Sequence, residues 1–142
     1  MVPRQVWLFQ LGCWVAIATS IVHLAAHITG ASLVGAGYDP ALEVLLPTHV
    51  WLVPGLWQPS FAGVLDGFSL TVAMLTATIG GAGLVIVGYK DVEPTLTRRV
   101  ARVFAIGMAM FLLVSITSMF SIETFFVATT AMCFGLASVT PE

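Results

Sequence analysis

Two histidines lie four residues apart in the segment TSIVHLAAHITG, inside the first long apolar stretch of the chain. Because residues i and i+4 share one face of a helix, His23 and His27 could bind the same metal ion. The same imidazoles could bind a haem or a chlorin axially, hold a quinone-like head group or relay protons. An ionisable side chain within a membrane-spanning segment is a functional candidate by default, so these histidines are the centre of the candidate site.

Three further residues are candidates for the same metal site, namely Glu123, Asp66 and His49. Imidazole and carboxylate ligands together suit zinc, iron or copper. Each also has a structural explanation. Asp66 precedes GFSL as an N-cap, Glu123 suits the positive end of a helix dipole, and His49 is explained as a hydrated loop residue. A metal ion, a haem-like ligand and a structural His–Glu hydrogen bond all stay open, and no residue is assigned a catalytic role.

The composition indicates an integral membrane protein. Of the 142 residues, 58% are hydrophobic and 8% are charged, whereas a soluble domain carries about 25% charged residues. The lipid bilayer is therefore the expected surroundings of the chain. Five basic residues are too few for a nucleic-acid-binding patch, and the chain contains no glycine-rich phosphate loop, HExxH or GxSxG motif.

Four stretches are apolar enough to be membrane-spanning helices, which need about 20 residues. They are residues 6–29, 67–89, 100–120 and 121–139. The first is expected to be a retained helix, because its apolar character continues past Ile28 without a cleavage site. The sequence thus predicts an all-α integral membrane four-helix bundle with up-down-up-down topology, formed by a single membrane domain over residues 1–142.

The basic residues predict the orientation. All five lie before the first span or around the connection between the second and third, at Arg4, Lys90, Arg98, Arg99 and Arg102. Because basic residues collect on the cytoplasmic side, both termini and the 90–99 connection are expected to face the cytoplasm, in a bacterial cytoplasmic membrane.

The segment between the first two spans, residues 30–66, is expected to form an extracytoplasmic cap. Its stretch DPALEVLL predicts a short helix with Asp39 as N-cap and Pro40 in the first turn. Trp51 and Trp57 are typical anchors at a membrane interface.

Small and polar residues mark the sides of the spans that pack together. On the first span they fall within an arc of about 100°, opposite large apolar residues, so both histidines are expected to face inward. The interval from Cys13 to His23 equals that from Glu123 to Cys133, about 15 Å of helix. If the two cysteines lie at the same depth in the membrane, Glu123 lies at the same depth as His23. The inward residues expected on the four spans are Gly12, Cys13, Ala16, Ser20, His23, His27 and Gly30; Ser69, Thr76, Gly80 and Gly83; Gly107, Met108, Phe111, Ser115 and Ser118; and Glu123, Phe126, Thr130, Cys133 and Ala137.

Several segments together resemble a group of small bacterial four-span membrane proteins whose activity is not established. The resembling pieces are IVHLAAH, DPALEVLL, GVLDGFSL and ETFFVATTAMCFGLA. The resemblance implies the four-span topology and no catalytic residue.

Three classes of function follow from these observations. A small chain with no soluble domain is first expected to be an accessory or structural subunit of a larger membrane complex, associated with other subunits or with itself. The second class is a metal- or cofactor-binding membrane protein that uses the outer histidines. The third is a small membrane enzyme acting on a lipid or a quinone through a His/Glu acid–base pair.

Overall fold

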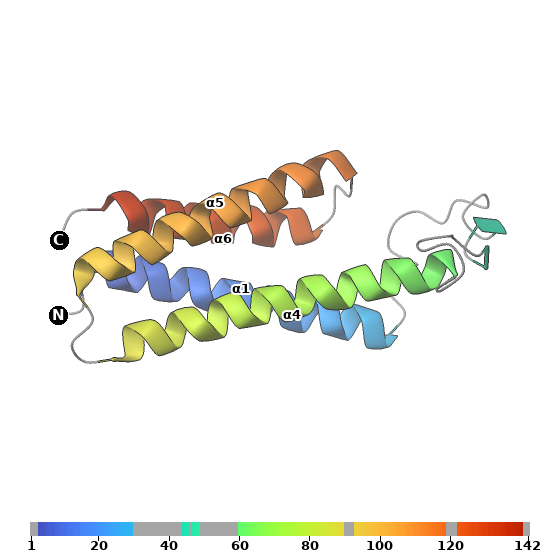
Figure 1. Cartoon of the computed structure of the whole chain (residues 1–142), viewed down its shortest axis with the longest axis horizontal. Helices are drawn as coiled ribbons and strands as arrows, with labels where there is room; N and C mark the ends of the chain where they lie inside the picture. Colours follow the sequence, from blue (N-terminus) through green and yellow to red (C-terminus); the bar gives the residue numbers. More distant parts are fainter. Residues whose placement is uncertain are drawn as a thin grey trace, which may run out of the picture. The chain divides into compact units, whose positions relative to one another are not determined.

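The computed structural model describes residues 3–29, 44–45, 47–48, 60–89, 93–118 and 122–140, except for a few side chains that include those of Asp66 and Glu123. Within these ranges the protein is all-α, with four long helices (Figure 1). They are α1 (Arg4–Thr29), α4 (Phe61–Gly88), α5 (Pro94–Ser118) and α6 (Ile122–Val139). Three segments of these helices are long and apolar enough to cross a membrane: Arg4–Ala25, Gly67–Gly88 and Pro94–Ile116.

The helices begin at recognisable caps. The Ser60 hydroxyl oxygen accepts a hydrogen bond from the backbone N–H of Gly63 at 3.1 Å, so Ser60 is the N-cap of α4. The interpretation of Asp66 as an N-cap is therefore wrong, because Asp66 lies inside α4. Helix α5 starts with Pro94 in its first turn, and the Glu93 carbonyl accepts the N–H of Thr97 at 3.3 Å.

The chain divides into two compact units. One comprises Met1–Ser20 and Leu75–Glu142, and the other comprises Ile21–Met74. Helices α1 and α4 each contribute a part to both units. Of the predicted cap over residues 30–66, only a few positions are described, so the predicted interfacial anchors Trp51 and Trp57 lie outside the described residues.

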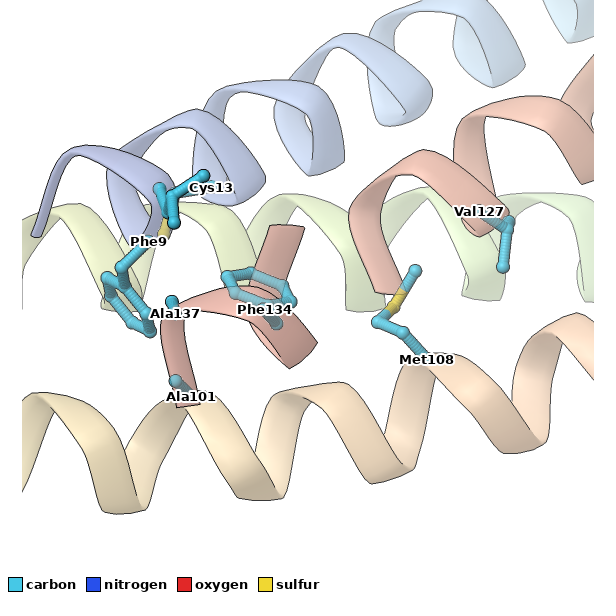
Figure 2. Close-up of a cluster of buried hydrophobic side chains, with 8 residues drawn as sticks. Phe9, Cys13, Ala101, Met108, Val127, Phe134 and Ala137 are labelled. Carbon is cyan, nitrogen blue, oxygen red and sulfur yellow. The ribbon is translucent and has the colours of Figure 1, made fainter. Parts of the chain in front are cut away.

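The core of the larger unit contains three phenylalanines from three helices. Phe9 of α1 lies 5.4 Å from Phe134 of α6 between ring centroids, and Phe104 of α5 lies 5.3 Å from Phe134. Figure 2 shows Phe9 and Phe134 together with Ala101 of α5 and Ala137 of α6. The Phe134 ring stands tilted to Phe9 and edge-on to Phe104, and the rings of Phe9 and Phe104 are stacked, arrangements that add to the stabilisation from burial. Hydropathy alone did not indicate this cluster.

Hydrogen bonds join the helices of this unit near both ends of α5. The Gln5 side-chain amide, which is fully buried, donates to the Pro94 carbonyl at 3.1 Å. Farther along α5, the hydroxyl groups of Ser115 and Thr124 lie 2.9 Å apart and join α5 to α6, which pack side by side (Figure 1). Because unpaired polar groups in an apolar interior are costly, these bonds also determine the axial register of the helices.

The predicted inward faces are largely confirmed. On α1, Gly12, Cys13, Ala16 and His23 are buried, whereas the opposite side is exposed. One prediction is wrong: Gly107 of α5 is exposed. The buried side of α5 contains Ala101, Met108 and Ser115, spaced seven residues apart, and Gly107 is turned away from Met108 by about 100°.

Candidate functional site

His23 lies on the buried face of α1 within the smaller unit. Its side chain is 7% exposed, and its Nδ1 atom lies 3.5 Å from the hydroxyl oxygen of Ser69 on α4. This contact is a long hydrogen bond, at the outer limit of the usual range. The Ser69 hydroxyl can donate to an unprotonated Nδ1 or accept from a protonated one, so either tautomer is compatible with it. His23 therefore faces α4, as the helical pattern predicts.

Ser69 was not predicted as the contact of His23, although the sequence placed it on the inward face of the second span. The expected contacts were Glu123, by its depth and face, then Asp66, then a bound ligand. The side chains of Glu123 and Asp66 lie outside the described part of the structure, so a contact of either with His23 stays a prediction. The signal that could have identified Ser69 is its position on the small-residue face of α4.

The other candidate ligands are described less completely. His27 lies one turn beyond His23 on α1 and is half-buried. Asp66 lies within α4 and Glu123 lies in the first turn of α6, and the side chains of both are outside the described part of the structure. His49 is also outside it. The described residues bring no three histidine, cysteine or acidic side chains together as a metal site, so the metal site stays a prediction.

Close approach of α1 and α4 in the larger unit depends on two glycines. A Cβ atom at Gly80 would lie 2.6 Å from the backbone carbonyl oxygen of Cys13. A Cβ atom at Gly83 would collide with the Sγ atom of Cys13. Because backbone packs directly on backbone at this crossing, a side chain larger than glycine at either position would push α1 and α4 apart there.

The two cysteines are free and buried, Cys13 on α1 and Cys133 on α6. A Cβ atom at Gly12 would lie 3.2 Å from the Cβ of Cys133 on α6, and Cys13 is the next residue along α1. The level arrangement assumed from the sequence intervals therefore agrees with the structure. Cys13 faces α4 and packs beside Phe9 in the core (Figure 2). Both thiols are thus packed among the helices, as buried cysteines commonly are.

Comparison of the chain with protein-family models, curated proteins and solved structures gives no match.

Proposed function

We propose that the chain is a four-span integral membrane protein and serves as an accessory or structural subunit of a larger membrane complex. Insertion is supported by the three segments that are long and apolar enough to cross a bilayer. The fourth helix, α6, has 18 residues and spans about 27 Å, close to the hydrocarbon thickness of about 30 Å. In the proposed topology both termini face the cytoplasm of a bacterial cell, on the side of all five basic residues.

The observation that carries the subunit role is the exposed side of α4. Gly67, Thr71, Thr78 and Ala82 are exposed there, at spacings that keep them on one side of the helix, and they lie between the large exposed residues Met74, Leu75 and Val85. In a membrane, small and hydroxyl-bearing residues mark helix faces that pack closely on other helices. This side lies opposite Gly80, through which α4 contacts α1, so α1 leaves it open. We propose that a transmembrane helix of another subunit packs on it.

The exposed side of α1 carries larger residues. Between Trp7 and Ile28 its exposed side chains are large and apolar except for Ala25, and they include two tryptophans whose side chains are more than half exposed. Such a surface suits acyl chains, because bulky aliphatic and aromatic groups replace lipid contacts well without close backbone approach. The exposed side of α4 differs from it by the small and hydroxyl-bearing residues between its large apolar ones, and this difference supports assigning protein to α4 and lipid to α1. The large exposed residues of α1 are Trp7, Trp14, Ile21, Leu24 and Ile28.

Site-specific photo-crosslinking in native membranes tests the subunit role. A photoreactive amino acid at Thr78 or Ala82 is expected to give a discrete adduct with another protein. The same probe at Ile21, which is 62% exposed on the bulky side of α1, is the matched control and is expected to label lipid. Equal lipid labelling from all three positions would contradict the proposal. Adducts that contain two copies of this chain would replace the accessory role with self-association.

A second candidate function is binding of a metal ion or a haem-like cofactor through His23. The observation in its favour is a buried imidazole held by the Ser69 hydroxyl at one ring nitrogen. Ligand histidines commonly have their second nitrogen oriented by such a hydrogen bond, which determines the tautomer. His27, one turn away on the same helix, would be the second ligand.

Elemental analysis and the visible spectrum of the protein purified in mild detergent test this candidate. If His23 is a ligand, the wild-type protein carries bound metal or an absorbance band in fixed stoichiometry, and His23→Leu removes it. Thr71→Ala is the matched control, because its hydroxyl bonds only the Gly67 carbonyl of its own helix at 2.8 Å. Wild-type protein with neither metal nor absorbance would contradict the candidate.

A further inference from the structure

We infer that the exposed face of α5 binds an anionic phospholipid at the inner membrane surface through Arg99 and Arg102. The inference rests on the proposed membrane insertion and adds a lipid class and a binding face to it. Both arginines are exposed, and residues three apart lie about 60° from each other around a helix. Guanidinium groups donate paired N–H bonds to phosphate oxygens, which makes arginine suited to a phosphodiester head group.

The three arginines at the start of α5 do not point the same way. Arg98 is half-buried, and its Nη2 atom donates to the Thr140 carbonyl at 3.5 Å, just beyond the C-terminus of α6. A cation there suits the negative end of the α6 dipole, so Arg98 stabilises the fold. Arg99 is turned by about 100° from Arg98 and is exposed, and Arg102 lies one turn beyond Arg98, about 40° from it around the helix, and is exposed as well. The structural arginine and the two exposed arginines can therefore be tested separately.

The position of Arg99 and Arg102 also favours an anion beside them. They lie in the second and third turns of α5, which starts at Pro94. At a spacing of three residues the two guanidinium groups repel each other. A bound phosphate offsets this repulsion, since it attracts both guanidinium groups.

An apolar strip continues from the arginines along the same side of α5. Val103, Ile106, Met110 and Leu113 have exposed fractions of 66%, 62%, 67% and 66%, so none belongs to the core. From Arg102 to Leu113 the helix rises about 16 Å, which matches one leaflet of a hydrocarbon core about 30 Å thick. A phospholipid whose phosphate lies at the arginines would therefore place its acyl chains along these four side chains.

Gly107 makes room for an acyl chain beside this strip. It is exposed, and a Cβ atom built on it would meet nothing within 4 Å. Gly107 therefore leaves a shallow depression in the surface of α5 beside Ile106 and Met110, where an acyl chain can approach the backbone. The exposed position of Gly107, unexplained by packing within the chain, is consistent with this use.

Nanodiscs that contain a mixture of phosphatidylglycerol and phosphatidylcholine test the inference. The protein is purified from them into mild detergent, and the retained lipid is measured by native mass spectrometry. We expect phosphatidylglycerol to exceed its bulk share by roughly 30-fold at low salt, because each basic side chain near an anionic surface contributes about fivefold. The excess should fall as salt is raised, because surface charges are screened.

Three variants separate lipid recognition from folding. Arg99→Gln with Arg102→Gln should abolish the preference. Arg99→Lys with Arg102→Lys keeps both charges but loses the bidentate geometry, so the preference should fall only in part. Arg98→Gln should lower the thermal stability of the protein and leave the lipid preference unchanged. Nanodiscs have no inside or outside, so an altered topology cannot produce these results.

Two results would overturn the inference in distinguishable ways. If the chain inserts in nanodiscs but retains both lipids in their bulk ratio, or if the glutamine pair keeps the preference, the lipid site is wrong and membrane insertion stands. If the chain does not enter these nanodiscs, membrane insertion and the lipid site are both wrong.

Discussion

The Nδ1 atom of His23 lies 3.5 Å from the hydroxyl oxygen of Ser69, and this contact joins α1 to α4 within the smaller unit. It connects an imidazole buried in an apolar helix to a neutral hydroxyl. The histidine that the sequence singled out is therefore part of the helix packing, and its chemistry depends on how strongly this contact holds the ring.

A double-mutant cycle of His23→Ala and Ser69→Ala measures that contact. We expect a coupling free energy of about 0.6 kcal/mol and not above ~1.7 kcal/mol, the range typical of hydrogen bonds between membrane helices. Equilibrium unfolding in mixed micelles is the measurement. Thr71→Ala is the control, because its hydroxyl bonds only within α4 and should show no coupling to His23. Strictly additive effects of the two substitutions would show that the contact contributes nothing.

Alanine substitutions at the neighbouring glycines Gly80 and Gly81 should have opposite effects on stability. A methyl group at Gly80 meets the Cys13 backbone at 2.6 Å, and backbone cannot move aside as a side chain can. We expect a loss of about 1–3 kcal/mol, as for other overpacked sites. At Gly81 a Cβ meets nothing within 4 Å, so alanine should stabilise the helix by up to about 1 kcal/mol. Thermal unfolding of both variants in the same detergent makes the comparison, and equal effects would contradict the helix crossing.

Removal of the aromatic ring at Phe134 should destabilise the protein far more than its removal at Phe125. Phe134 is fully buried against Phe9 and Phe104, whereas Phe125 on the same helix is 71% exposed. Phe134→Ala is expected to cost about 3–5 kcal/mol, the usual range for a buried phenylalanine. Phe125→Ala should be close to neutral. Chemical unfolding monitored by circular dichroism tests the pair, and similar losses would show that the phenylalanine cluster is not the core.

Reporter fusions test the proposed orientation. Fusions at Thr95 and Glu142 should both report the cytoplasm, and a fusion near Gly37 should report the outside, because every basic residue lies on one side of the proposed membrane. An external reading at Thr95 would overturn the argument from the basic residues and would place Arg99 and Arg102 at the outer surface.

The inward faces could be predicted from the sequence because they depend on local periodicity. The spacing of Cys13, Ala16 and His23 places them on one side of α1 whatever the helix packs against, and all three are buried. The same reasoning succeeded for Thr130 and Ala137 on α6. It failed for Gly107, because a glycine has no side chain to bury and suits an exposed surface as well as a packed one.

The all-α class and the long apolar helices were thus determined by the sequence alone, since both follow from composition and from the spacing of residues along one helix. Only the tertiary structure decided that His23 contacts Ser69, that Gln5 bonds the Pro94 carbonyl, and that Arg98 turns inward while Arg99 does not. These contacts depend on the rotation and the axial shift of one helix against another. A change of one residue in that register, about 1.5 Å and 100°, would exchange the contacting side chains without altering the periodicity of either helix.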